Sequence, residues 1–226
     1  MEENDVARFP RPVHGRIPNF EGSVRAAEKL QELPAWEKAR AIKANPDSPQ
    51  MPVRRLALQA GKVVYMAVPR LREERCFLEL DPKKLRGRED QASSIKGAFK
   101  HGRLVDPGEI RKVDLLVAGS VAVNQDGARV GKGGGYSDLE YGIGREFGII
   151  DECTTTLTTV HPVQVVTYQI EMLRHDFPLD FILTPEGITE TGHHYQKPDG
   201  IYWDELDDEK IRAIPLLWKL KKHKRI

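Results

Sequence analysis

Apolar and β-branched residues gather in four short runs along the chain, at residues 62–68, 113–118, 160–167 and 179–184. These runs are mostly apolar throughout and lack the strict alternation of a strand that has one face in water. Strands that are apolar on both faces are typical of a parallel sheet covered by helices. The pattern therefore predicts four strands in the interior of such a sheet.

Helical spacing of apolar residues occurs before and between these runs. One predicted helix begins at Ser23, a suitable N-cap, and a second begins at Pro34 and ends at residues 45–49. Further helices are expected around 71–80, 134–146 and 167–175. Strands that alternate with helices indicate an α/β fold with a largely parallel sheet flanked by helices.

The domain organisation follows from the length and from the two ends of the chain. At 226 residues, and with no internal repeat, the sequence predicts a single α/β domain over residues 1–226. Residues 1–22 contain three prolines and are expected to form an extended arm. Residues 186–226 are expected to be irregular, with an acidic cluster at 204–209 and a basic end at 219–225. A solvated helix explains this charge pattern, and a basic tail that touches phosphates or RNA is the alternative.

Charge and cysteine content narrow the classes of function. The chain has 35 Lys and Arg against 34 Asp and Glu, a net charge of +1, which argues against a general nucleic-acid binder. Cys76 and Cys153 form no CxxC pair, so we expect free thiols in a reducing compartment rather than a zinc site. No apolar run is long enough to cross a membrane, and residues 1–5 are acidic, unlike a signal peptide. We therefore expect a cytoplasmic protein without membrane contact.

Glycine is concentrated in one segment of the chain. Seven of the 19 glycines fall within residues 127–144, between a predicted strand and a predicted helix. Successive backbone N–H groups in such a loop, together with the positive end of a helix, attract anions. Arg129 and Lys132 add full positive charges, which a merely flexible surface loop would not explain. The segment therefore predicts a phosphate-binding loop.

This loop differs from the two commonest phosphate-binding motifs. The P-loop pattern fails because Gly133 follows Lys132 where Ser or Thr is required. The GxGxxG pattern fails because the sixth position counted from Gly131 is Tyr136. A P-loop ATPase and a nicotinamide-dependent dehydrogenase are both disfavoured.

Two carboxylates are candidate magnesium ligands. Asp138 lies in the first turn of the helix predicted after the loop, where the helix dipole also favours an ordinary acid. Beside bound phosphates it could hold Mg²⁺, which usually takes one or two protein carboxylates and keeps several waters. Asp176, at the end of the helix predicted over 167–175, is the second candidate.

The run from Arg129 to Asp138 resembles the Arg-x-Gly-x-Gly-x-Gly-Tyr-Tyr-Asp hallmark of the 5-formyltetrahydrofolate cyclo-ligase family. Residues 113–123 are similar to the strand and turn that precede this motif, and residues 175–185 to the His-Asp segment that follows it. Further segments resemble the branch of the family named for a methenyltetrahydrofolate synthetase domain, at residues 9–20, 45–47, 69–72 and 197–203. The resemblance covers nearly the whole chain.

This resemblance implies a fold and a reaction. The fold is a single α/β domain of the sugar-phosphate isomerase and CoA-transferase architecture. The reaction, in one-carbon metabolism, is the ATP- and Mg²⁺-dependent closure of 5-formyltetrahydrofolate to 5,10-methenyltetrahydrofolate with release of ADP and phosphate. A ligase whose partner is a reduced folate or related pterin is thus expected.

The resemblance also implies which residues form the site. Arg129 and Lys132 would act in catalysis by neutralising the phosphoryl charge. The ATP phosphates would be held by Arg16, Arg129, Gly131, Lys132, Gly133, Gly134, Gly135, Tyr136 and Ser137, with Arg11 as the alternative to Arg16. Asp138 and Asp176 would bind Mg²⁺.

Three departures from the family pattern keep other functions open. Ser137 replaces the second Tyr of the motif, and Leu139 replaces an Arg that commonly follows the Asp. Residues 47–50 lack the Glu that contacts folate in the ligases. The alternative function is that of a catalytically altered relative that binds nucleotide or RNA. A sugar-phosphate isomerase or CoA-transferase is a third hypothesis, which rests on shared architecture alone.

Overall fold

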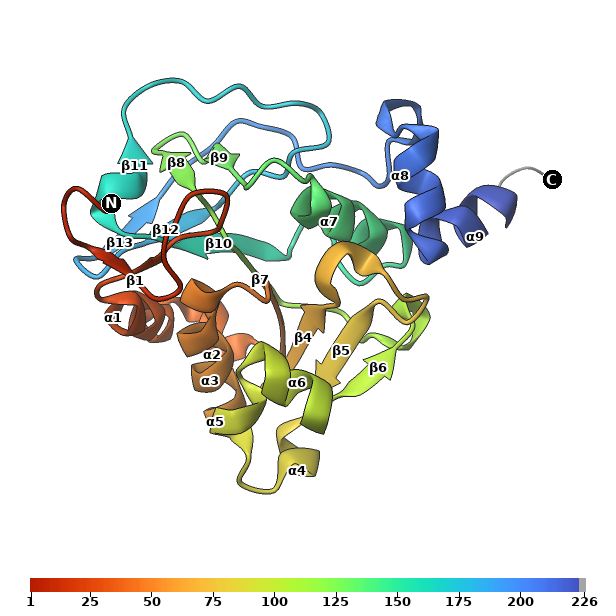
Figure 1. The fold of residues 1–226 in the computed structure, drawn as a ribbon, viewed down its shortest axis with the longest axis horizontal. Coiled ribbons are helices and arrows are strands. Elements are labelled where there is room, and N and C mark those ends of the chain that lie inside the picture. Colours follow the sequence, from red (N-terminus) through yellow and green to blue (C-terminus); the bar gives the residue numbers. More distant parts are fainter. Residues whose placement is uncertain (224–226) are drawn as a thin grey trace.

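An eight-stranded sheet runs through the computed structural model of the chain, which describes residues 1–223 (Figure 1). Its strand order is β13-β12-β10-β7-β3-β4-β5-β6. Five neighbouring strands are parallel: β12 (Phe181–Leu183), β10 (Thr155–Thr159), β7 (Leu115–Ala118), β3 (Ala41–Ala44) and β4 (Val63–Ala67). Antiparallel strands lie at the two sides: β13 (Ile188–Glu190), β5 (Phe77–Leu80) and β6 (Arg103–Val105). The expected α/β fold with a largely parallel sheet is confirmed.

The order of the strands reverses at one point in the sheet. From β3 the chain builds β4, β5 and β6 on one side, and it then returns to place β7, β10 and β12 on the other. β3 and β7 are therefore adjacent in space although Ala44 and Leu115 are far apart in the sequence. Ligands of open α/β sheets bind at such a reversal, outside the carboxyl ends of the strands.

Helices cover both faces of this sheet (Figure 1). One core cluster joins the sheet to one group of helices: α1 (Ser23–Glu28), α2 (Pro34–Lys38), α3 (Met51–Gln59), α4 (Pro82–Leu85), α5 (Glu89–Ala92) and α6 (Ile95–His101). The other cluster includes residues of α7 (Tyr136–Glu146), α8 (Asp208–Ala213) and α9 (Pro215–His223). No helix within residues 1–223 is long and apolar enough to cross a membrane.

The apolar runs at 62–68, 113–118 and 179–184 are confirmed as β4, β7 and β12. The strand predicted over 160–167 is wrong, because that segment holds a 3-10 helix (Pro162–Gln164) and the two-residue β11 (Val165–Val166). The strand next to β7 is the threonine-rich β10. Its hydroxyls are buried because they find acceptors: Thr156 Oγ1 donates to Pro178 O at 2.7 Å and Thr158 Oγ1 to Ala118 O at 2.8 Å.

Helices begin at Ser23 and Pro34 and span most of 134–146, as expected, but the N-cap of α1 is Gly22 and not Ser23. The second helix ends at Lys38, and residues 41–44 form β3, because burial between β4 and β7 outweighs their helical spacing. The helix predicted over 71–80 is also wrong: Phe77–Leu80 is β5, whose backbone pairs with β4 and β6. Residues 167–175 form no helix.

The two ends of the chain are more ordered than the sequence suggests. The predicted arm folds back on itself, because β1 (Ala7–Arg8) pairs with β2 (Asn19–Phe20) and Ile17 is buried. The segment expected to be irregular from residue 186 contains β13, α8 and α9. Its α8–α9 part packs through Ile211, Ile214 and Leu217 on the core cluster that also contains residues of α7. Of the predicted basic end, Lys224 and Arg225 lie outside the described residues.

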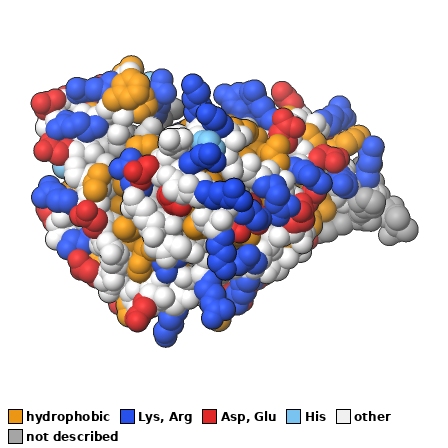
Figure 2. All heavy atoms as spheres, turned by 90° about the horizontal axis from the view of Figure 1, so that it is seen from below, with side chains coloured by type: hydrophobic (Ala, Val, Ile, Leu, Met, Phe, Trp, Pro, Cys, Tyr) orange, Lys and Arg blue, Asp and Glu red, His pale blue; other side chains and the backbone are white. Residues whose placement is uncertain are grey.

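Charged side chains of both signs are mixed over the surface. On the face shown in Figure 2, Lys and Arg gather toward the middle and right, with Asp and Glu between them. Exposed ion pairs occur on the surface of the protein, for example Arg75 with Asp106 at 3.2 Å and Arg103 with Glu109 at 2.6 Å. Such exposed pairs add little stability.

Candidate functional site

Two loops meet where the strand order reverses. Residues 45–50, called the β3 loop, follow β3. After β7 the chain passes through β8 (Ala122–Asn124) and β9 (Arg129–Val130), which with β11 form a small three-stranded sheet. It then enters residues 131–135, called the glycine loop, which lead directly into α7. The predicted phosphate loop thus lies on the side of the sheet where ligands of this fold class bind.

The backbone of the glycine loop is open to a ligand. Gly133 and Gly135 adopt left-handed φ values of 85° and 61°, which side-chain-bearing residues rarely accept. A Cβ added at Gly133 would meet no atom within 4 Å. Within the described chain, no side chain caps the first turn of α7. Its N–H groups are therefore available to an anion, and the helix dipole favours negative charge there.

Arg129 and Asp138 face each other beside this loop. Arg129 Nη2 lies 2.5 Å from Asp138 Oδ1, and the side chains are only 3% and 12% exposed. The guanidinium also lies 4.3 Å from the centroid of the Phe177 ring, while its Nε is buried without a hydrogen-bond partner in residues 1–223. Arg129 is therefore a buried cation that orients Asp138, and its guanidinium is not exposed to solvent.

The two predicted magnesium ligands lie close enough to interact electrostatically. Burial raises the pKa of Asp176 above its ordinary value, the Leu173 N–H that bonds to this carboxylate at 2.9 Å opposes the shift, and the charge of Asp138 raises the pKa further. No group of three His, Cys, Asp or Glu side chains suited to a metal occurs within residues 1–223. Two carboxylates with substrate phosphates and water are a common magnesium environment, so these residues fit the ion.

Lys132 is paired with the β3 loop. Its Nζ lies 2.9 Å from Asp47 Oδ1, and the Lys132 side chain is 49% exposed. Buried Arg54 holds the backbone of this loop by donating to the carbonyl oxygens of Asn45 and Asp47. Burial lowers the pKa of Arg54 to about 10, and the charge of Asp47 opposes that shift. The β3 loop thus presents a carboxylate to the lysine that was predicted to neutralise phosphate.

A buried ion pair ties β3 to α7 beneath the loop. Lys43 and Glu140 are in direct contact, with side chains 4% and 6% exposed. Burial raises the pKa of Glu140, and the positive charge of Lys43 opposes that rise. Lys43 Nζ also donates to Asn45 Oδ1 at 2.6 Å, and Asn45 Nδ2 donates to Ser137 Oγ at 3.2 Å. Sequence reasoning missed Lys43 and Asn45 because it placed them in or just after a helix.

Arg16 is the predicted site residue that stands apart. It is exposed, and within residues 1–223 no hydrogen bond or ion pair joins its side chain to the glycine loop. Its neighbour Ile17 lies at the carboxyl end of β7, where a Cβ added to Gly119 would be 3.0 Å from Ile17 Cγ2. The arm therefore reaches the edge of the sheet, but through an apolar side chain.

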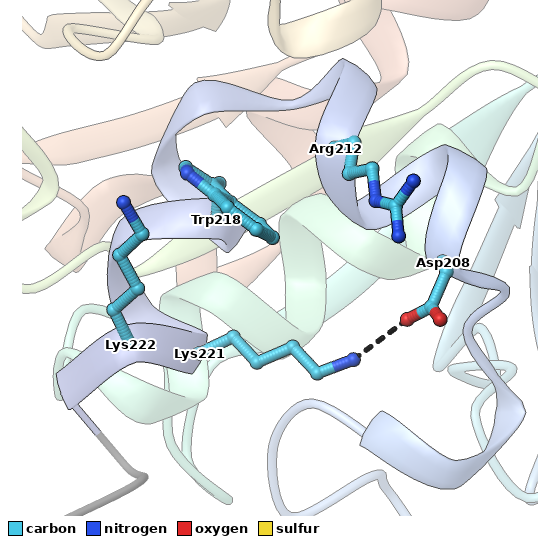
Figure 3. Close-up of a pocket in the computed structure, with 5 residues that line it drawn as sticks. All are labelled: Asp208, Arg212, Trp218, Lys221 and Lys222. Carbon is cyan, nitrogen blue, oxygen red and sulfur yellow. Dashed lines mark hydrogen bonds and ion pairs between the residues drawn. The ribbon is translucent and has the colours of Figure 1, made fainter.

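A cavity of about 80 Å³ adjoins Asp138 between α7 and the C-terminal segment. Gly135, His175, Tyr202, Glu205 and Lys210 contribute to its walls. A separate hollow between α8 and α9, shown in Figure 3, contains none of the predicted site residues. The cavity at Asp138 borders the glycine loop through Gly135.

Residues 7–185 match the model of the 5-formyltetrahydrofolate cyclo-ligase family. The chain is 39% identical over 224 residues to a methenyltetrahydrofolate synthase domain-containing protein of Bos taurus, a match that covers 98% of this chain and 59% of that protein. The protein of that name from Mus musculus is 39% identical over 228 residues, covering 100% of this chain and 61% of its own. The chain thus spans about three fifths of the length of the curated relatives it matches.

Two solved structures resemble the fold more distantly. The NMR structure of Aquifex aeolicus 5,10-methenyltetrahydrofolate synthetase has a TM-score of 0.49 and 16% identity, and the match covers 82% of this chain and 88% of that one. A 5,10-methenyltetrahydrofolate synthetase from Mycoplasma pneumoniae has a TM-score of 0.42 and 13% identity, with coverage of 72% and 83%.

Proposed function

The chain belongs to the 5-formyltetrahydrofolate cyclo-ligase family, and from this premise we propose that it closes 5-formyltetrahydrofolate to 5,10-methenyltetrahydrofolate with hydrolysis of ATP to ADP and phosphate. The observation that carries the proposal is the glycine loop at the strand reversal. It combines an uncapped helix start, a paired Arg129 and Asp138, and Lys132 within one stretch of ten residues. These features are what a polyphosphate and its counterion require.

The chemistry of this closure explains why phosphate binding is central. The formyl oxygen is a very poor leaving group, so the γ-phosphoryl group of ATP is first transferred to it and ADP is released. N10 then attacks the formyl carbon and loses its proton, and the oxygen departs as phosphate. The protein contributes mainly by holding the reacting groups in line and by neutralising phosphoryl charge.

Each part of the site has a role in that scheme. The N–H groups of the glycine loop and of the first turn of α7 would receive the phosphates. Lys132 is half-exposed, and within residues 1–223 only Asp47 holds it, so it is able to exchange that partner for a phosphate. Asp138 and Asp176 would hold Mg²⁺, which would neutralise phosphoryl charge. Arg129 holds the orientation of Asp138 through their ion pair.

The β3 loop is where folate specificity is in question. Gln50 lies in residues 47–50, the region where the resembled ligases carry a folate-contacting Glu and this chain has none. Its side chain is fully buried, Nε2 donates to Thr159 Oγ1 at 3.3 Å, and Oε1 has no hydrogen-bond partner within residues 1–223. Its neutral amide both donates and accepts, unlike a carboxylate, which only accepts. ATP binding is therefore supported by more of the described contacts than folate binding is.

The test is to incubate the purified chain with ATP, Mg²⁺ and 5-formyltetrahydrofolate and to follow the near-ultraviolet absorbance of the methenyl product. We expect product only when ATP is present, and none from Lys132→Ala. If the unaltered chain binds ATP in a calorimetric titration but forms no product and binds no folate, the alternative of an altered nucleotide-binding relative replaces the proposal.

A further inference from the structure

The C-terminal segment contributes to the site although it lies outside the matched family region. The family match ends at residue 185, yet Tyr202, Glu205 and Lys210 line the cavity beside Asp138. Figure 1 shows α8 and α9 beside α7, on the side away from the N-terminus. The segment from residue 200 to 210 is thus a wall of the site rather than a free tail.

Lys210 reaches the glycine loop directly. From α8, its Nζ donates to the carbonyl oxygen of Gly134 at 3.0 Å and lies 5.4 Å from the centroid of the Tyr136 ring. A Cβ added at Gly135 would be 3.1 Å from the same Nζ. The ammonium group therefore sits against the last peptide of the loop, immediately before α7.

This contact determines which way a backbone N–H points. In a trans peptide the C=O and the following N–H point in opposite directions. Because Lys210 holds the Gly134 oxygen on the α8 side, the Gly135 N–H is turned to the other side of the loop. Glycine has unusual freedom to rotate, so a peptide between two glycines needs such an anchor to keep one orientation.

Other contacts hold the C-terminal segment in place. Arg174 contacts the carboxylates of Asp204 and Glu205, and His175 contacts Glu205. Arg174 also lies 4.6 Å from the centroid of the Tyr202 ring. Arg174 and His175 come directly before the predicted magnesium ligand Asp176 in the sequence. The same contacts therefore connect the C-terminal wall to the metal-binding side of the site.

We propose that Lys210 is a positioning residue for polyphosphate binding: it anchors the Gly134 carbonyl, which presents the Gly135 N–H to the phosphates. The inference rests on the proposed function, because it takes ATP as the ligand of the glycine loop. Lys210 acts through the loop peptide, and its charge adds to the positive potential that a polyphosphate meets.

The experiment compares the affinities of the full chain for ATP, ADP and AMP in the presence of Mg²⁺, measured by titration calorimetry. Lys210→Met keeps the length of the side chain but removes its charge and its hydrogen bond. The matched control is Arg212→Met, on the same helix, because Arg212 lines the separate hollow in Figure 3 and not the cavity at Asp138. Lys210→Arg restores a charged donor.

We expect Lys210→Met to weaken ATP binding about tenfold, the usual scale for losing a charge-assisted hydrogen bond, and to leave AMP binding within about twofold. Arg212→Met should change neither affinity, and Lys210→Arg should recover most of the loss. Thermal unfolding of each variant shows whether the fold is retained. If Lys210→Met unfolds, the comparison of Lys210→Arg with the unaltered chain decides, because an arginine that restores no ATP affinity contradicts the anchor.

Three results would overturn the inference. One is an unchanged ATP affinity in Lys210→Met. Another is an equal loss of ATP and AMP binding, which would indicate general loosening of the site. The third is a failure of the unaltered chain to bind ATP, which would overturn the proposed function as well. The first two leave that function standing, so the two failures are distinguishable.

Discussion

Arg129 and Asp138 form an ion pair across the glycine loop, with 2.5 Å between Nη2 and Oδ1 and almost no exposure of the guanidinium. The residues are nine positions apart, one on β9 and the other in the first turn of α7. The loop between them is thereby pinned at both ends. The pair therefore fixes the position of Asp138 relative to the loop.

Removing the carboxylate of this pair should destabilise the protein. Asp138→Ala leaves the buried Arg129 charge without its partner, which costs about 3 kcal/mol in the free energy of unfolding. Urea denaturation measures the loss. The control is Glu21→Ala, which breaks the exposed Arg8–Glu21 pair and should cost less than about 1 kcal/mol. Equal losses in the two variants would contradict the buried pair.

The Lys43–Glu140 pair makes a second stability prediction. Glu140→Gln leaves the buried Lys43 charge uncompensated and should lower the free energy of unfolding by about 3 kcal/mol. Replacing both residues with apolar ones, Lys43→Met with Glu140→Leu, should cost less than the sum of the single changes, because neither charge then remains buried alone. Additive losses in a double-mutant cycle would show that the two side chains do not interact.

The Lys132–Asp47 contact predicts a gain in affinity. Asp47→Asn removes the carboxylate that competes with phosphate for Lys132, and ATP should bind about threefold more tightly. Lys132→Ala should weaken binding instead. Calorimetric titration of ATP measures both changes. A weaker affinity in Asp47→Asn would mean that Asp47 orients the lysine and does not compete for it.

Stability should depend on pH through Asp176. Burial is the main reason that its folded-state pKa lies above the ordinary value of 3.8, so the folded protein holds this proton more tightly than the unfolded chain. The contribution of Asp176 to stability is therefore full below pH 3.8 and is lost as pH rises through the raised pKa. Asp176→Asn should lack this dependence. Urea denaturation across that pH range tests this prediction. If the free energy of unfolding changes with pH in the same way in both proteins, the prediction is contradicted.

Local patterns predicted the central features of this protein. The apolar runs of β4 and β7 indicated buried parallel strands, because such strands are shielded on both faces and need few polar positions. The glycine loop, Arg129 and Asp138 lie within ten consecutive residues, so spacing alone was sufficient to predict that they lie together. The alternation of strands and helices was also sufficient to indicate the fold class.

Long-range contacts decided what local patterns could not. Residues 41–44 have helical spacing and weak strand propensity, and they become the central strand because β4 and β7 bury them on both sides. The threonines of β10 are interior because distant carbonyl oxygens accept from their hydroxyls. Propensity is a weak preference that tertiary packing of this kind overrides.

The sequence by itself determined the fold class and the glycine loop with Arg129, Lys132 and Asp138 beside it, because these depend on residues that are neighbours in the chain. Only the tertiary structure decided which distant residues contact the glycine loop, the β3 loop and α7. Asp47 meets Lys132, Lys43 meets Glu140, and Lys210 meets Gly134 from segments far away in the sequence. The physical reason is that a hydrogen bond or ion pair depends on distance in space, and the strand reversal between β3 and β7 brings the β3 loop beside the glycine loop and α7.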